Sequence, residues 1–318
     1  PEAAEVREML LILGGASLFP DPRFECPAGA AQALDEAERH FGQGELEEAA
    51  VDYERALADC PGNAVWWMYY GDVDFLREDY AGALAKFDKA LKIEPCFWRA
   101  HRFASDTHYR LGDLPNTYRS SLLAVACNPT YGKGWDYLHQ TQDNHAGVFR
   151  HVDADWPGPV ATDGGPVIAL TPPDGDGEEA SRESALMLVY NLGRVPIGEE
   201  SAGMTPMELE RQGIITGLSF LAEDGFTGEF ERPMLRAWQL LAEASRDGML
   251  DEAIFMLRLD ESLLPEFMAF RDAHLDRLIV YTATYLAPLG PDSPILADEE
   301  AFYRVLPELR PTGEGSAE

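Results

Sequence analysis

The histidines are the first residues to test for chemistry, because imidazole can ligate a metal or transfer a proton near neutral pH. His139, His145 and His151 are six residues apart. That spacing does not place three side chains on one helical face, where neighbours recur every three or four residues. His101 and His108 are seven apart and would share a face. The histidines therefore predict no metal site.

Other motifs for catalysis or ligand binding are equally sparse. The run Asp174-Gly-Asp176-Gly-Glu178 offers carboxylates for Ca²⁺, but it lacks the spacing and terminal bidentate glutamate of an EF-hand, so an acidic turn is favoured. The sequence contains no P-loop and no G-x-G-x-x-G, H-E-x-x-H or G-x-S-x-G motif. We therefore expect no cofactor and no enzymatic activity, although an unrecognised catalytic domain between residues 180 and 300 stays open.

The elements that position these residues follow a 34-residue repeat, which recurs through four sets of residues. The sets are Pro61, Pro95 and Pro129; Ala56, Ala90 and Ala124; Leu46, Tyr80 and Leu114; and Ala49, Ala83 and Thr117. They resemble the G-x-[LY]-x-x-A-x(6)-A-x(4)-P half of the tetratricopeptide (TPR) repeat. The second copy also carries Trp67, Tyr70 and Gly71 from the first half.

This resemblance implies an all-α solenoid of helical hairpins at residues 30–63, 64–97 and 98–131. In the second copy we expect one helix from Ala64 to Arg77 and another from Tyr80 to Ile93. One hairpin cannot bury its apolar stripe alone, so stacked neighbours and a capping helix, predicted at residues 132–142 within the domain 30–144, must form the core.

The flanking segments differ in composition. Residues 1–29 predict a short amphipathic helix and a loop that cap the first hairpin. The alternative is that this segment fills the groove of its own or another molecule, which would make a homo-oligomer. Residues 145–180 are rich in Gly, Pro and Asp and predict a linker, in which residues 166–170 could form one short strand.

Residues 181–306 predict a second, irregular and acidic helical domain. Thr205 and Glu208 form a capping box with Pro206 at the first helical position. Residues 234–267 resemble a degenerate fourth TPR hairpin, in which Asp260 replaces a small alanine, and a long helix from about Leu264 to Leu286 would cap it. We expect a disordered tail at residues 307–318.

The four cysteines, Cys26, Cys60, Cys96 and Cys127, include no C-x-x-C pair. We expect free cysteines near helix ends in a reducing compartment, with a disulfide between neighbouring copies as the alternative. This expectation favours the cytoplasm. The sequence contains no run of 18 or more apolar residues, which is the feature that would predict a membrane-spanning helix.

The net charge is −31. The electrostatic field of so large a negative charge repels nucleic acids and anionic lipid surfaces. It is consistent with solubility or with adaptation to high salt in an arginine-preferring organism of bacterial-like composition. It is also consistent with attraction of a basic protein partner.

In TPR arrays, repeat positions 2, 5, 9 and 12 of the first helix of each hairpin point into a peptide-binding groove. Position 12 holds Phe41, Phe75 and Tyr109; position 9 holds Glu38, Asp72 and Asp106; position 5 holds Leu34, Met68 and Arg102; position 2 holds Ala31, Val65 and Arg99. Aromatic residues and methionine offer adaptable apolar contacts. The acid in each copy would favour Lys or Arg on a bound segment. Arg102, Asp106 and Arg110 could instead satisfy one another.

The resemblance thus implies a non-enzymatic adaptor or scaffold that binds a basic or basic-plus-apolar segment. The co-chaperone branch, which grips a C-terminal carboxylate with Lys, Asn and Arg, is disfavoured because only Arg99 fits and Glu38 would repel a carboxylate. His101 occupies a packing position of the family, so a core or interface role is favoured for it. The rival hypothesis is an enzyme or ligand-binding domain at residues 180–300 whose substrate the repeats recruit.

Overall fold

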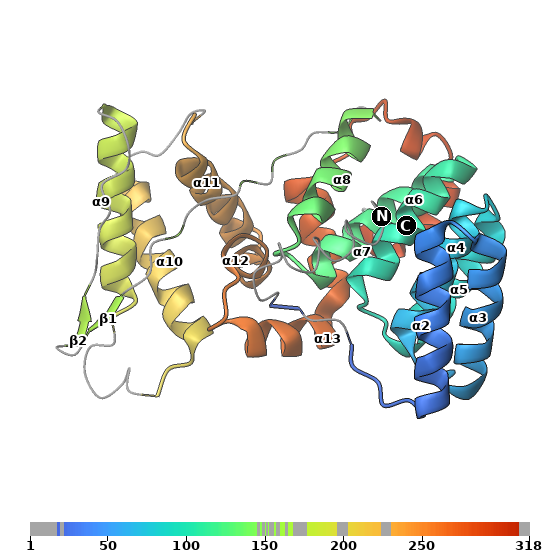
Figure 1. Ribbon diagram of the computed structural model, residues 1–318. Helices are drawn as coiled ribbons and strands as arrows, with labels where there is room; N and C mark the ends of the chain where they lie inside the picture. The colour runs from blue at the N-terminus through green and yellow to red at the C-terminus, as the bar shows by residue number, and fades with distance from the viewer. Residues whose placement is uncertain are drawn as a thin grey trace, which may run out of the picture. The chain divides into compact units, whose positions relative to one another are not determined.

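The computed structural model describes residues 18–19, 22–144, 147, 150, 152, 156, 160–162, 165–167, 177–195, 203–223 and 230–311. The chain forms two compact units, which are largely helical (Figure 1). The first unit comprises Pro1–Gly147 and Leu289–Glu318, and the second comprises Val148–Pro288. The second unit is therefore an insertion between two parts of the first.

Three consecutive helical hairpins and one further helix build the first unit, as the 34-residue repeat predicts. The hairpins pair α2 (Ala28–Gln43) with α3 (Leu46–Asp59), α4 (Ala64–Leu76) with α5 (Tyr80–Ile93), and α6 (Trp98–Leu111) with α7 (Leu114–Cys127). Helix α8 (Gly132–Asn144) packs on α7 and is the predicted cap. The all-α solenoid predicted for this part of the chain is confirmed.

The turn inside each hairpin has a residue in the left-handed region. Gly44 and Gly112 have φ of 77° and 73° and supply that conformation without a side-chain clash. The second hairpin uses Glu78, with φ of 63°, which is uncommon for a residue with a Cβ. Asp79 and Asp113, which follow the second and third turns, cap α5 and α7 by accepting bonds from the backbone amides of Gly82 and Asn116.

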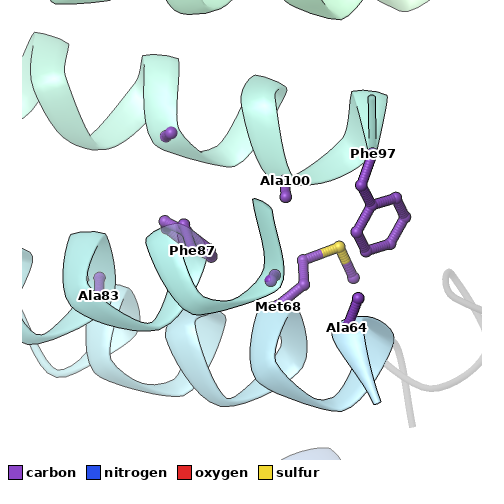
Figure 2. Close-up of a cluster of buried hydrophobic side chains, with 8 residues drawn as sticks. Ala64, Met68, Ala83, Phe87, Phe97 and Ala100 are labelled. Atoms are coloured by element: carbon purple, nitrogen blue, oxygen red, sulfur yellow. The ribbon is translucent and has the colours of Figure 1, made fainter. Parts of the chain in front are cut away.

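The hairpins pack through small residues facing large ones. Figure 2 shows the cluster between the second and third hairpins, where Phe87 lies among Ala83, Ala100 and their neighbours. A Cβ built on Gly71 would lie 2.5 Å from the Phe87 ring, so glycine at that position allows α4 and α5 to approach closely. The alanines that mark the repeat in the sequence are thus contact points between helices.

The C-terminal segment returns to the first unit. An antiparallel bridge joins Gly147 to Leu289, and α14 (Glu299–Val305) then packs on α7. Phe302 is buried and stacks on Tyr118, with ring centroids 6.4 Å apart. This contact explains why α7 is buried along nearly its whole length, including two serines.

The predicted boundary at residue 306 is therefore wrong, because residues 289–306 belong to the first unit. The predicted tail begins with an ordered 3₁₀ turn at Pro307–Leu309. Residues 312–318 lie outside the described residues, as does the helix predicted around residues 5–13.

Two disulfides replace the predicted free cysteines. Cys26 is bonded to Cys60 and Cys96 to Cys127, with Cα atoms 5.6 Å and 5.3 Å apart. Each bond joins the residues before the first helix of a hairpin to the end of its second helix, in the first and third hairpins. The prediction was wrong because the cysteines pair across a hairpin, over 34 and 31 residues. The argument for a reducing compartment is thereby lost.

The second unit contains two helical hairpins followed by a long helix. Helix α9 (Glu178–Gly193) pairs with α10 (Pro206–Glu223), and α11 (Pro233–Arg246) pairs with α12 (Leu250–Arg258). Helix α13 (Leu264–Tyr281) continues as a π-helix to Leu286, and these are the bounds predicted for the capping helix. The predicted single helix is, however, kinked at His274, whose φ of −141° and ψ of 38° are not helical. The predicted capping box opens α10, because the Glu208 amide donates to Thr205 Oγ1 and the Thr205 amide to Glu208 Oε2.

The α11–α12 pair matches the predicted fourth hairpin in its turn but not in its length. Gly248 has φ of 72° and joins the two helices. Asp260, where the repeat has alanine, accepts bonds from the Ser262 amide at 2.9 Å and the Leu263 amide at 3.3 Å. Helix α12 therefore ends at Arg258, because the carboxylate stabilises a turn in place of the last helical turn.

Two short strands lie in the segment predicted as a linker. Strand β1 (Val160–Thr162) pairs antiparallel with β2 (Gly165–Val167), with Ala161 opposite Pro166. Of the strand predicted at residues 166–170, the first two residues lie in β2, which has a partner, and residues 168–170 lie outside the described residues. No helix in the described parts of the chain combines the length and hydropathy that spanning a bilayer requires.

Candidate functional site

The first helices of the three hairpins, α2, α4 and α6, carry the residues predicted to line a groove. We call these ten residues the A-helix face: Leu34, Glu38, Phe41, Met68, Asp72, Phe75, Arg99, Arg102, Asp106 and Tyr109. Their spacing of three, four and seven residues keeps them on one side of each helix. Nine of the ten are at least partly accessible, and Tyr109 is the most exposed at 51%.

Two carboxylates of the A-helix face come from the first two hairpins. Glu38 is half-buried and accepts a hydrogen bond from the hydroxyl of Tyr53 on α3, which restricts its rotamer. Asp72 is also half-buried. A carboxylate held in a partly desolvated position interacts more strongly with a cation than one surrounded by water.

The acid of the third hairpin is neutralised by its own helix. Arg102 Nη2 lies 3.2 Å from Asp106 and donates to the Tyr137 hydroxyl. Burial works against the Arg102 charge, but Asp106 and Tyr137 together hold the pKa of the guanidinium above its ordinary value. The predicted ladder of three acids is therefore two acids followed by an internal ion pair.

Met68 does not lie on the accessible surface. Its side chain is fully buried in the cluster with Ala64, Phe87 and Phe97. The prediction that Met68 lines the groove is therefore wrong for this structure. Helical spacing gives the direction of a side chain but does not show what covers it.

The aromatic residues of the A-helix face divide between packing and exposure. Phe41 and Phe75 are partly buried against the hydrophobic clusters, and Phe75 lies 5.6 Å from the ring of Tyr80. Tyr109 exposes half of its surface at the end of α6. Apolar contact area is thus available beside each carboxylate.

Sequence reasoning missed an aromatic and cationic cluster between α6 and the capping helix. Trp98 and Tyr131 pack with centroids 4.2 Å apart, and Arg99 lies over the Trp98 ring at 5.2 Å. Arg102 lies 4.6 Å from the ring of Tyr137. The signal was present as Trp98 at the start of the third copy and Tyr137 in the predicted cap, but their contact required the third and fourth elements to be placed together.

His101 is a core residue, as favoured from its repeat position. Burial lowers its pKa to about 4 from the ordinary 6.5, and Nε2 lies 2.9 Å from the carbonyl oxygen of Pro95. The neutral ring donates this bond. Below pH 6.5 the unfolded chain binds a proton that the folded chain does not, so stability falls as the pH drops from about 6.5 to about 4.

We expect His101 to account for about 3 kcal/mol of this acid destabilisation, since one pKa unit corresponds to about 1.4 kcal/mol. Chemical unfolding at pH 7.5 and pH 4.5 measures it. His101→Gln, whose amide can still donate, should lose less stability on acidification than the wild type. His139→Gln, at an exposed site, is the control for the substitution itself, because it leaves His101 in place. Equal losses in the wild type and His101→Gln would contradict the assignment.

No group of three His, Cys, Asp or Glu residues in the described ranges has a geometry that could hold a metal ion. His145 and His151, and the acidic turn at Asp174 and Asp176, lie outside those ranges.

The second unit has one notable cavity and one notable buried cluster. The cavity, of about 270 Å³, lies between α10, α12 and α13 and is bordered by a two-bond ion pair of Arg211 with Asp251. The cluster surrounds Glu210, which is fully buried and lies 3.0 Å from Arg194 and 3.3 Å from Arg258. Sequence reasoning did not single out Glu210, because nothing in the local pattern distinguishes it from the exposed glutamates of α10.

The solved structures that resemble this protein match only part of its chain. No family model matches the sequence, and no curated protein matches it. Two solved structures resemble 36% of this chain, each with 16% identity and a TM-score of 0.35. One is the first TPR of Spaghetti (RPAP3) bound to the HSP90 peptide SRMEEVD, of which 92% is covered; the other is the NMR structure of the first TPR domain of the human RPAP3 protein, of which 91% is covered.

The 34-residue repeat of the sequence is therefore seen directly in the hairpins of this chain. Three consecutive helical hairpins, α2–α3, α4–α5 and α6–α7, each have a left-handed residue in the turn, and the repeat alanines Ala49, Ala83 and Ala90 are buried between helices.

Proposed function

We propose that this protein is a non-enzymatic adaptor whose A-helix face binds a protein segment that carries basic and apolar residues. The observation that supports this proposal is the pair Glu38 and Asp72, each half-buried on the first helix of a hairpin. Aromatic side chains lie three residues further along the same helices, at Phe41 and Phe75. Lys and Arg suit such a surface, because their stems cover apolar rings while their charged groups reach a carboxylate.

The charge of the A-helix face changes from the first two hairpins to the third, and this change sets the orientation of the bound segment. The first two hairpins present acids, whereas the third presents Arg99 beside the Arg102–Asp106 ion pair. A segment that is basic throughout would meet repulsion over the third hairpin. We therefore propose a segment whose basic residues lie over α2 and α4 and whose part over α6 is apolar or acidic. The net charge of −31 would speed its association at low salt.

The two disulfides support a proposal for the working compartment. Two disulfides in a chain with no free cysteine favour an oxidising compartment over the cytoplasm predicted from the sequence. The role of the N-terminal 29 residues in homo-oligomerisation stays a prediction, since most of that segment lies outside the described residues.

Charge reversal tests the adaptor proposal. A displayed library of helical and extended peptides would be selected on the wild type, and a selected peptide would be titrated by fluorescence anisotropy. We expect Glu38→Lys with Asp72→Lys to weaken a selected basic peptide by about thirtyfold to several hundredfold, because two ion pairs are lost and each is worth about 1–2 kcal/mol at a partly buried position.

A matched control separates local contacts from net charge. Glu54→Lys with Asp88→Lys removes one glutamate and one aspartate from exposed sites on α3 and α5, at a single repeat position. This variant should bind almost as the wild type does at moderate salt. If both variants lose affinity equally, or if the selected peptides carry no basic residues, the A-helix face is not the binding site proposed.

A further inference from the structure

The segment Pro22–Pro27, which precedes α2, is fastened to the body of the first unit at one point. Cys26 is bonded to Cys60 at the end of α3, and the side-chain amide of Asn63 lies 3.5 Å from Cys26 Sγ. Asn63 is also the residue that caps α4. The disulfide therefore holds the segment beside the first turn of α4.

Phe24 reaches past the hairpin that its own segment leads into. Cys26 packs with the cluster of the first hairpin, but Phe24 packs against the cluster shared by the second and third hairpins. Cys60 lies four residues before Ala64, so the members of that cluster within reach are those near the start of α4 and α6. These are Ala64, Met68 and Phe97, and Figure 2 shows the Met68 thioether between the other two.

Burial of Met68 has consequences for the A-helix face. Met68 lies one helical turn before Asp72, on the same side of α4. A segment bound at Asp72 and extending toward the start of α4 would contact Met68, which is fully buried in this structure. The protein's own side chains therefore cover Met68, and they belong to the cluster against which Phe24 packs.

We propose that Pro22–Pro27 is an autoinhibitory strap, latched by the Cys26–Cys60 disulfide, in which Phe24 covers Met68 at the start of α4. The strap occupies the place of an apolar side chain of the partner segment. Its effect on partner binding rests on the proposed function, whereas the covering of Met68 does not.

The second disulfide provides an internal comparison. Cys96–Cys127 closes the third hairpin as Cys26–Cys60 closes the first, over a similar length of chain. Cys96, however, follows directly on the turn after α5, so no free segment is tethered there. Removing each disulfide separately distinguishes a latch from a general stabiliser.

The test is the rate at which hydrogen peroxide oxidises Met68 in the full-length protein, followed by peptide mass spectrometry. We expect a several-fold faster rate in Cys26→Ala with Cys60→Ala and in Phe24→Ala, which keeps the disulfide. Cys96→Ala with Cys127→Ala should raise the rate less, because it destabilises the first unit without releasing Phe24. Met256, buried in the second unit, serves as the internal standard for peroxide exposure.

The outcomes separate the strap from the adaptor function. An unchanged Met68 rate in Phe24→Ala and in the Cys26 and Cys60 variant overturns the strap, as does an equal rise in the Cys96 and Cys127 variant. If Met68 is oxidised faster in these variants and they also bind a selected basic-plus-apolar peptide about tenfold more tightly, both the strap and the adaptor function are supported. Tighter binding is expected because the variants convert closed molecules into binding-competent ones. If Met68 is released but no peptide binds any form, the strap stands and the proposed function fails.

Discussion

Replacing Arg258 with alanine is expected to lower the free energy of unfolding of the second unit by about 2–4 kcal/mol, because it removes one of the two cations beside the fully buried Glu210 and leaves Arg194 as the other. Arg258 is buried and contacts three groups: Glu210 at 3.3 Å, Asp260 at 2.7 Å and the Tyr190 hydroxyl at 3.2 Å. Glu210 has no route to water, since it is fully buried. Urea unfolding, followed by tryptophan fluorescence from Trp238 and its neighbours, measures the loss.

The same substitution at an exposed ion pair is the control. Arg211 makes a two-bond pair with Asp251, but both side chains are more than a third exposed, so Arg211→Ala should cost less than about 1 kcal/mol. Adding Glu210→Gln to Arg258→Ala should cost further stability, because it leaves the mostly buried Arg194 without its carboxylate. Equal costs for Arg258→Ala and Arg211→Ala would show that the buried cluster is not a stabilising network.

Removing the Cys96–Cys127 disulfide is expected to destabilise the first unit by about 3–4 kcal/mol, which is the loop-closure term for a loop of this length. Cys127 is fully buried, so Cys96→Ala with Cys127→Ala avoids placing a hydroxyl in the core. The shift of the urea unfolding midpoint, measured with and without a dithiol reductant, gives the effect.

Thiol counting provides the matching control. The unfolded, unreduced wild type should show no reactive thiols, because all four cysteines are paired. The variant with all four cysteines changed to alanine should not respond to the reductant. Four reactive thiols in the wild type would contradict both disulfides, and with them the oxidising compartment.

The repeat could be predicted from the sequence because its signals are local. The prolines 34 residues apart end helices, and the alanines at the same interval allow helices to pack closely. The residues within each copy therefore specify its helical hairpin. The bounds of α5 and the long helix ending at Leu286 were predicted to the residue or nearly so for this reason. The Thr205–Glu208 capping box also depends on only four residues.

The candidate site was predicted only in part. Repeat positions placed Glu38, Asp72 and Tyr109 on a partly accessible face. The spacing of Arg102 and Asp106 predicted their ion pair as an alternative, and the structure contains it. Repeat positions could not show that Arg102 bonds to Tyr137 or that Met68 is buried, because the first depends on α8 and the second on how α4, α5 and α6 pack together.

Taken by itself, the sequence determined the hairpins, their turns and the face that carries the acids, since backbone hydrogen bonding and apolar periodicity act within tens of residues. Only the tertiary structure decided the pairing of Cys26 with Cys60, the return of Phe302 to α7 and the burial of Glu210 beside Arg258. Those contacts join residues far apart along the chain or from different helices. They form because each buried apolar surface, charge or cysteine sulfur needs a partner. The chain contains many candidate partners, and local sequence patterns do not show which of them is used.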